Sequence, residues 1–324
     1  MRKLIKVTLF IFILLLICSA SYFAFKYFVY GEVYQERPDI EKGSILDKIL
    51  SKHEEDIYKP SEDVKQRAYS VLLTGIDSEN MDHSRTDTIM VAFIDPKNKK
   101  TSILSIPRDT YVQIAGRKMD KITHAHNYGI NSTIMTVEDF LDVKIDYYAT
   151  INFNGFLDLV DTLGGVHVDV EKNMTFPDRI TGKQFSLEKG EQKLTAIQAL
   201  NYARFRSDGE GDFGRNRRQQ QVLKAIVDES TSFRNVTKIK GLLDDLGDNV
   251  KTDMDFDVLS RTLAKMKSTS SENIYTIPMD AYPTFISGVS YVQVKEDSLE
   301  QVKSYIKDVL DGENPKPIDT DSNK

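Results

Sequence analysis

Hydrophobic residues follow three different patterns along this 324-residue chain. Near the N-terminus, residues 7–25 form one uninterrupted apolar run. Further along, short β-rich runs bounded by turn residues alternate with segments whose apolar positions recur every three or four residues. Together the patterns predict one membrane-spanning helix followed by a single α/β domain.

The apolar run has the length and flanks of a membrane anchor. Its 19 residues carry no charge and suffice to cross a bilayer, and Arg2, Lys3 and Lys6 precede it. Because basic flanks stay in the cytoplasm, the remaining chain is expected outside the cell. A cleaved signal peptide is the alternative, but its apolar core is normally about 7–15 residues long. We predict a cytoplasmic N-terminus (1–6) and a retained signal-anchor (7–27) in a single-pass, type II membrane protein.

The rest of the chain divides by composition and local pattern. Residues 28–67 are charged and predict a stem, 68–311 predict the folded domain, and 312–324 predict a disordered tail. "YSVLLTGID", "DTIMVAFID", "TSILSIPRD" and "GVHVDV" are typical of strands, and "FNGFLDLVDTLGG" of a helix. Thr195 and Gln198 have capping-box spacing before another helix, and "YTIPMDAYPTFISGVSYVQV" indicates a hairpin.

Charged residues stand where the first three predicted strands begin or end: Asp77, Arg85, Asp87, Arg108 and Asp109. The short connections between these strands suit antiparallel neighbours, and sequential strands usually adjoin. If they adjoin here, all of these charges collect at one edge of the sheet, which indicates a site. The alternative is that strand ends are wet and carry charges without a function.

A cluster of arginines follows in the second half of the chain. Residues 204–218 hold five arginines and no lysine, and arginine is the better fork for phosphate or carboxylate. The apolar stripe of the helix expected after Gly214 places Arg215 and Gln219 on its buried side, where an unpaired charge is costly. Either an ion pair with Asp212 or an anionic ligand at the helix N-terminus would neutralise Arg215.

Composition narrows the function further. A net charge of -6 and a pI near 5.5 argue against nucleic-acid binding. The one cysteine, Cys18, lies in the apolar run, so the external domain has no disulfide, as is common outside Gram-positive cells. Glycines at 209, 211 and 214 match G-x-G-x-x-G, but no strand precedes them, so a dinucleotide cofactor is not predicted.

Several motifs between residues 71 and 230, about half of the chain, resemble the LytR–CpsA–Psr family. They are "LLTGIDSE", "SRTDTIMVAFIDP", "ILSIPRDTYV", "DKITHAHNYG", "IDYYATINFNGFLDLVDTLGGVHVDV" and "LTAIQALNYARFRSDGEGDFGRNRRQQQVL". The resemblance implies an αβα-type sandwich with a mixed central sheet flanked by helices. It also implies an extracytoplasmic phosphotransferase. Such an enzyme moves a glycopolymer, such as wall teichoic acid, from a polyprenyl diphosphate lipid to a muramic acid hydroxyl of peptidoglycan, forming a phosphodiester.

The resemblance also assigns roles to residues. Asp77 and Asp87 match the family's Mg²⁺-associated aspartates, and Lys121 lies in its "KI" motif. The diphosphate-binding set would be Arg85, Arg108, Arg204, Arg206, Arg215, Gln219 and Asp212. The catalytic set would be Asp87, Asp109, Arg108 and Arg215.

These residue types suit the chemistry. Arginine forks and Mg²⁺ neutralise the charge of an opening diphosphate, and Mg²⁺ prefers carboxylate oxygens. One carboxylate must also take the proton of the acceptor hydroxyl, and Asp87 and Asp109 are both candidates.

Two other functions use the same residues. One is a protein that binds polyprenyl phosphates without turnover, and the other is a hydrolase that splits polyprenyl diphosphates with water. Simple capture of an anion does not need Asp77 and Asp87, which favours an enzyme. The lipid needs an apolar slot, which the face of "FNGFLDLV" would line, unless those residues are plain core.

Overall fold

A six-stranded mixed sheet forms the centre of the molecule, with strand order β11-β6-β1-β2-β3-β12. The computed structural model describes residues 33–53, 67–177, 182, 184–231, 247–255, 258–259 and 273–318. The strands are β1 (Tyr69–Ile76), β2 (Thr86–Asp95), β3 (Lys100–Ser105), β6 (Tyr147–Ile151), β11 (Val250–Thr252) and β12 (Ile274–Ile277). β2 runs antiparallel to both β1 and β3, which confirms the prediction that the first three strands adjoin.

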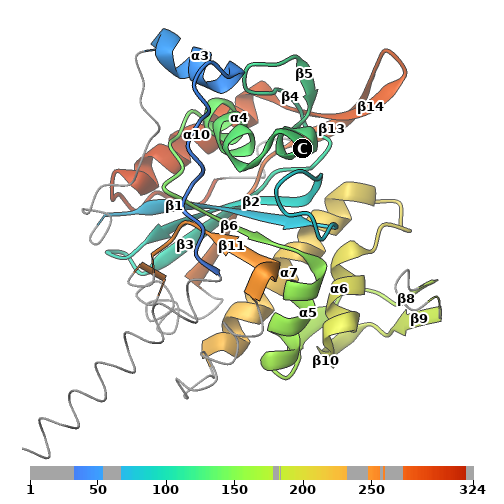
Figure 1. Cartoon of the computed structure of the whole chain (residues 1–324). Coiled ribbons are helices and arrows are strands. Elements are labelled where there is room, and N and C mark those ends of the chain that lie inside the picture. The colour runs from blue at the N-terminus through green and yellow to red at the C-terminus, as the bar shows by residue number, and fades with distance from the viewer. Residues whose placement is uncertain are drawn as a thin grey trace, which may run out of the picture.

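Helices cover both faces of this sheet (Figure 1). On one face lie η3 (Ile122–Tyr128), α4 (Ile130–Leu141) and α10 (Glu296–Leu310), and on the other α5 (Phe153–Thr162), α6 (Ala196–Arg204) and α7 (Gly211–Thr231). β2 serves both layers because its side chains alternate: Val91 packs toward α4 and α10, and Met90 packs toward α7. The α/β class with a mixed, helix-flanked sheet is thereby confirmed.

A second core holds α5, α6 and α7 together with the antiparallel pair β7 (Val166–Val170) and β10 (Gly190–Leu194). Local sequence signals set the starts of these helices. The Asn152 side chain accepts a hydrogen bond from the Gly155 N–H at the start of α5, and Thr195 and Gln198 form the predicted capping box of α6. The remaining elements are α3 (Ile45–His53), β4 (Tyr111–Gln113), β5 (Met119–Lys121), β8 (Met174–Pro177), β9 (Gln184–Leu187), η4 (Gly247–Asn249), β13 (Ala281–Ile286) and β14 (Val289–Val294).

The folded domain extends past both of its predicted boundaries. Val33, expected in the stem, is 1% exposed, and Arg37 lies 2.9 Å from Asp253 in an ion pair. At the other end, the backbone N–H of Ile318, expected in the tail, donates to the Tyr275 hydroxyl at 2.8 Å. Isolated contacts of this kind leave no periodic pattern in the sequence.

The predicted anchor (7–27) lies outside the described residues, as do residues 28–32 and 54–66 of the stem and 319–324 of the tail. Among the helices that the structure describes, none is both long and apolar enough to span a bilayer.

Candidate functional site

The ends of the first three strands meet at one edge of the sheet, as predicted. Ile76 at the end of β1 pairs with Thr86 at the start of β2, and the N–H of Ile106 after β3 donates to the Ile89 carbonyl. This register brings Arg108 into an ion pair with Asp87. Asp77 and Arg85 stand at the same edge, and both are exposed.

Asp109 joins Arg108 to a lysine from a neighbouring hairpin. Lys121 Nζ lies 2.9 Å from Asp109 Oδ1, and Arg108 Nε lies 4.0 Å from Asp109 Oδ2. β5 brings Lys121 to this edge because the N–H groups of the next two residues donate to the carbonyls of Thr110 and Arg108. The predicted catalytic and binding sets omit Lys121, although the "KI" motif is a signal for it.

Asp212 in the first turn of α7 connects the arginine cluster to this edge. Its Oδ1 lies 3.0 Å from Arg206 Nε and 3.0 Å from Arg215 Nη2, and its negative charge also acts on Arg108. Burial raises the pKa of Asp109, but the hydrogen bond from Lys121 and the charges of Lys121 and Arg108 outweigh it and hold this pKa below its usual value. Asp109 therefore stays ionised at neutral pH.

Arg215 is the most deeply buried cation of this group, with 3% of its surface exposed. Within the described part of the chain, its Nε and Nη2 have no hydrogen-bond partner, because the approach of Asp212 at 3.0 Å does not align with an N–H. Burial lowers the pKa of Arg215 to about 10, with Asp212 opposing this shift, so it is charged at neutral pH. A buried guanidinium with unused donors is suited to binding an anion.

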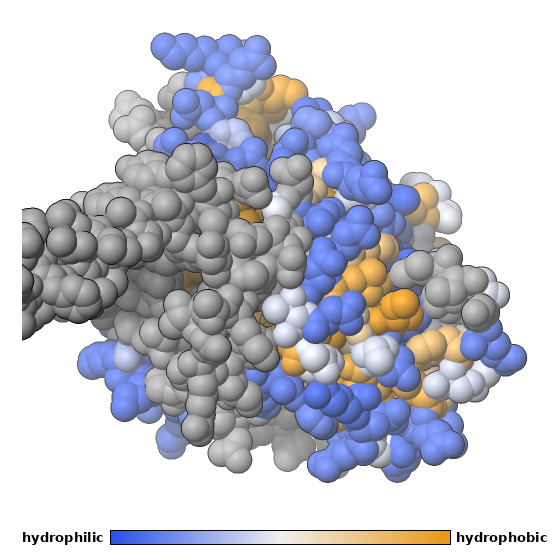
Figure 2. Space-filling model, turned by 60° about the horizontal axis from the view of Figure 1, so that its bottom comes forward, coloured by the Kyte–Doolittle hydropathy of each residue, from blue (hydrophilic) through white to orange (hydrophobic). Residues whose placement is uncertain are grey.

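A largely apolar cavity of about 330 Å³ adjoins this cluster, between the sheet and helices α5, α6 and α7. Asp87 lines this cavity and is also part of the charged cluster. Arg204 and Gln219 line the cavity as well. Phe153 and Phe156 of the predicted "FNGFLDLV" face line it too. Figure 2 brings this side of the molecule forward and shows a hydrophobic patch bordered by hydrophilic residues.

The helix that carries the arginine cluster begins earlier than expected. α7 begins at Gly211 rather than after Gly214, and the N–H groups of Phe213 and Gly214 bind the Glu210 carbonyl, so these amides are not free for an anion. α6 ends at Arg204, and Arg206 lies in the segment between α6 and α7, so the two side chains have different surroundings. The Arg204 guanidinium carbon lies 4.3 Å from the centre of the Phe153 ring at the cavity, whereas Arg206 pairs with Asp212.

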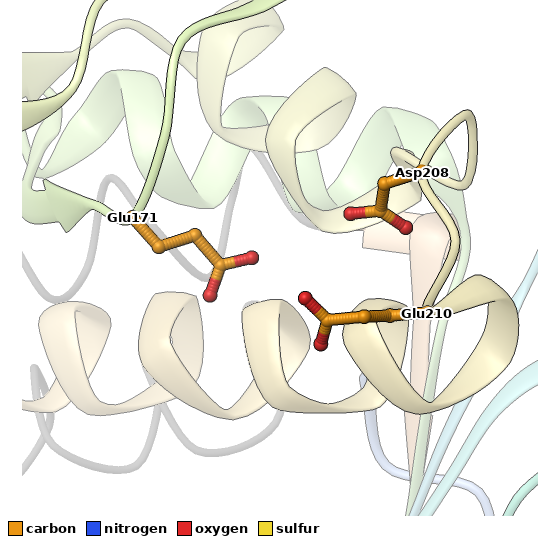
Figure 3. Close-up of side chains that lie close together, drawn as sticks. All are labelled: Glu171, Asp208 and Glu210. Carbon is orange, nitrogen blue, oxygen red and sulfur yellow. The ribbon is translucent and has the colours of Figure 1, made fainter.

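The last two arginines of the window belong to a separate network of ion pairs. Figure 3 shows its three carboxylates, Glu171, Asp208 and Glu210, which converge from different segments. Arg218 is fully buried and binds Asp208 at 2.9 Å as well as Glu171, and Arg217 binds Glu171 at 2.9 Å.

Lys172 is the third cation of this network and lies 2.8 Å from Asp208. The three carboxylates are close enough to share a metal ion, yet each is already paired with a cation. The arrangement therefore holds the loop before α7 in place. Gly214 belongs to it, since a Cβ there would meet the Arg218 guanidinium at 2.9 Å.

A model of the LytR_cpsA_psr family matches residues 35–308. The chain belongs to the LytR–CpsA–Psr family. The polyisoprenyl-teichoic acid–peptidoglycan teichoic acid transferase TagU of Halalkalibacterium halodurans is 39% identical over 251 residues, 76% of this chain and 80% of that protein. TagU of Bacillus subtilis is 37% identical over 250 residues, which cover 76% of this chain and 79% of that protein.

Solved structures agree with this membership. TagV of B. subtilis superposes with a TM-score of 0.69 at 32% identity, covering 77% of this chain and 99% of TagV. TagT bound to LI-WTA superposes with a TM-score of 0.66 at 33% identity, covering 78% of this chain and 94% of TagT. The LytR–CpsA–Psr motifs recognised in the sequence thus supply the strand edge, the Lys121 that pairs with Asp109, and the start of α7 that carries Asp212 and Arg215.

Proposed function

We propose that this protein transfers an anionic glycopolymer, wall teichoic acid or a similar polymer, from a polyprenyl diphosphate carrier to a muramic acid hydroxyl of peptidoglycan. The reaction forms a phosphodiester and releases the lipid phosphate. One observation carries the proposal: the unused donors of buried Arg215 lie in a cationic cluster that adjoins an apolar cavity. The transferase names of the TagU relatives support it.

The diphosphate and its lipid have complementary places in this arrangement. Arg108 lies at the strand edge and pairs with Asp87, whereas Arg206 and Arg215 both lie beside Asp212 at the start of α7. These three cations would neutralise the diphosphate as its bond opens. Arg204 and Gln219 line the cavity and would bind where the phosphate meets the lipid. The polyprenyl chain would lie in the apolar cavity, which removes it from water.

A carboxylate must accept the proton of the muramic acid hydroxyl as it attacks phosphorus. Asp87 and Asp109 both lie beside the Arg108 guanidinium: Asp87 faces its Nη1 atom, and Asp109 faces its Nε atom. Lys121 and Arg108 hold Asp109 in its ionised form, which prevents it from protonating before the hydroxyl arrives. Lys121 is thus a positioning residue that keeps the carboxylate aligned.

The donor set at this edge fits a magnesium ion. Asp77 and Asp87 offer hard carboxylate oxygens, and Asp212 Oδ1 is a buried oxygen without a hydrogen-bond partner among the described residues. We propose that Asp77 and Asp87 hold the ion. When bound, Mg²⁺ supplies positive charge to the diphosphate oxygens.

The proposed reaction requires the domain to face the cell wall. The basic flank and the apolar run of residues 7–25 support a retained signal-anchor in the cell membrane, with the domain on the outer side of a Gram-positive cell. The anchor would keep the site near membrane-bound lipid carriers.

The full-length protein in detergent, incubated with a lipid-linked precursor, Mg²⁺ and isolated peptidoglycan, tests this function. We expect polymer covalently attached to the glycan, detected after the lipid has been extracted. Release of free polymer and lipid phosphate would indicate a hydrolase, and retention of intact precursor would indicate a binding protein. Either result contradicts the proposal.

A further inference from the structure

β13 and β14 form a hairpin that projects away from the body of the domain (Figure 1). Its turn contains Ser287 and Gly288, both with positive φ, as two-residue hairpin turns require. No residue from 281 to 294 is charged, although 28% of the chain is. Phe285 is 74% exposed and Tyr282 is 48% exposed. An exposed and uncharged hairpin of this kind indicates a binding surface.

The base of this hairpin is attached to the candidate site. The N–H of Val292 donates to the carbonyl of Asp109 at 2.8 Å. The Tyr291 ring lies 4.7 Å from the ring of Tyr111, and Lys121 Nζ lies 5.6 Å from its centre. The hairpin surface is thus continuous with the residues that hold the Asp109 carboxylate.

The strand register decides which side chains share the face next to Lys121. Tyr282 is opposite Gln293, and Thr284 is opposite Tyr291, so these four side chains lie on one face of the hairpin. Phe285 has the other parity and lies on the opposite face. The face that continues into the site therefore combines two tyrosine rings with amide and hydroxyl groups.

We propose that this face, formed by Tyr282, Thr284, Tyr291 and Gln293, binds the acceptor glycan strand of peptidoglycan. The inference rests on the proposed function and names the place of its second substrate. Tyrosine offers a rigid apolar ring with a polar tip, which suits the apolar C–H face and the hydroxyl groups of a sugar ring. Gln293 and Thr284 add neutral donors and acceptors for acetamido groups.

Charge and polarity distinguish the acceptor glycan from the anionic polymer and the lipid chain of the donor. The polymer on the donor carries phosphate charges, which call for cations, and residues 281–294 contain none. The lipid chain has the apolar cavity on the α5–α6–α7 side. A neutral sugar backbone matches the uncharged face, and its position beside Lys121 would lead the muramic acid hydroxyl toward Asp109.

Titration calorimetry tests the binding, with the full-length protein in detergent and soluble, uncross-linked glycan strands of alternating N-acetylglucosamine and N-acetylmuramic acid that keep their stem peptides, so that each lactyl carboxyl group is in an uncharged amide bond. Tyr282→Ala should weaken glycan binding about tenfold, as loss of a central aromatic contact does. Phe285→Ala, on the other face of the same strand, is the matched control and should bind as the wild type does. Both side chains are exposed, so neither variant should change the melting temperature.

Three results would overturn the inference: no binding of glycan by the wild type, unchanged binding by Tyr282→Ala, or equal loss in both variants. Transfer assays separate it from the proposed function. Tyr282→Ala should raise the KM for the glycan and leave the donor-induced rise in melting temperature unchanged. If glycan binding is weakened by Tyr282→Ala alone but the wild type transfers nothing, the proposed function fails and the hairpin is still a glycan-binding surface. If Tyr282→Ala transfers polymer normally at every glycan concentration, the hairpin inference fails and the proposed function stands.

Discussion

Arg215 Nη2 lies 3.0 Å from Asp212 Oδ1, one turn earlier on α7, without forming a hydrogen bond to it. The two charges attract each other, yet the donor capacity of the guanidinium is not used. A salt bridge that served only the fold would satisfy its donors, since an unmade hydrogen bond in a buried site is costly. The pair is thus arranged to accept a further anion.

Arg215→Lys should therefore lose activity although it keeps the positive charge. A lysine cannot reproduce the planar fork that binds two phosphate oxygens, and losing one such donor costs about 100-fold in rate. The measurement is the initial rate of polymer transfer, together with the rise in melting temperature that polyprenyl diphosphate causes. Both should fall.

Arg217→Lys is the matched control for this variant. Arg217 is on the same helix, but its side chain is 45% exposed and pairs with Glu171 and Glu210. Its replacement should leave transfer within twofold of the wild type. The phosphate-binding role of Arg215 would be abandoned if Arg215→Ala destabilised the ligand-free protein and polyprenyl diphosphate left the wild-type melting temperature unchanged.

Gly214→Ala should destabilise the domain by about 1–3 kcal/mol, as overpacking of a buried site does. The new Cβ would meet the Arg218 guanidinium at 2.9 Å, and this side chain cannot withdraw because Glu171, Asp208 and the Phe205 carbonyl hold it. Gly209→Ala is the control, since a Cβ there has no atom within 4 Å. Chemical denaturation of both variants measures the difference, and equal stabilities would refute the packing role of Gly214.

Asp77→Ala and Asp87→Ala should each abolish transfer while the domain remains folded. Asp77 is exposed and Asp87 is on the partly open strand edge, so the core loses little in either variant. Circular dichroism and transfer assays, with and without a chelator, provide the measurement. Full activity in excess chelator would remove Mg²⁺ from the mechanism, as would unchanged activity in both variants.

Lys121→Met should lower the stability of the protein at neutral pH and make that stability less dependent on acid. The depressed pKa of Asp109 contributes stability that is fully present above the ordinary carboxyl pKa, near 3.9, and that is lost as the pH falls through the lower folded value. Without Lys121, burial of Asp109 is less opposed, so its folded pKa rises. The folded pKa then lies closer to the unfolded value, so thermal unfolding between pH 3 and 7 should show a lower melting temperature at neutral pH and a smaller further loss in acid than in the wild type. Superimposable profiles would contradict this prediction.

Protease added to protoplasts should remove the domain beyond residue 31. The basic flank at Arg2, Lys3 and Lys6 orients the anchor with the N-terminus inside, so the domain is accessible from outside. Immunoblotting and mass spectrometry of the mature N-terminus provide the readout. Protection of the domain, or a mature protein that starts near Ser21, would refute the retained anchor.

Much of the fold follows from signals that are local in the sequence. Alternating and apolar runs gave β1, β2 and β3, and short connections gave their antiparallel order. The capping box at Thr195 is likewise a property of four adjacent residues. From the strand order alone it follows that Asp87, Arg108 and Asp109 meet at one edge.

The division of the five clustered arginines was decided only by tertiary structure. All lie within residues 204–218 and are chemically alike, and the window offers them three carboxylates of its own, Asp208, Glu210 and Asp212. Glu171, 46 residues before Arg217, draws Arg217 and Arg218 into a structural network, whereas Asp212 and the strand edge keep Arg206 and Arg215 at the site. The sequence determines which charges exist and how each helix or strand presents them. Which charges neutralise one another depends on distances of a few ångströms, because Coulomb attraction and hydrogen bonding are short-ranged in water, and those distances exist only after packing.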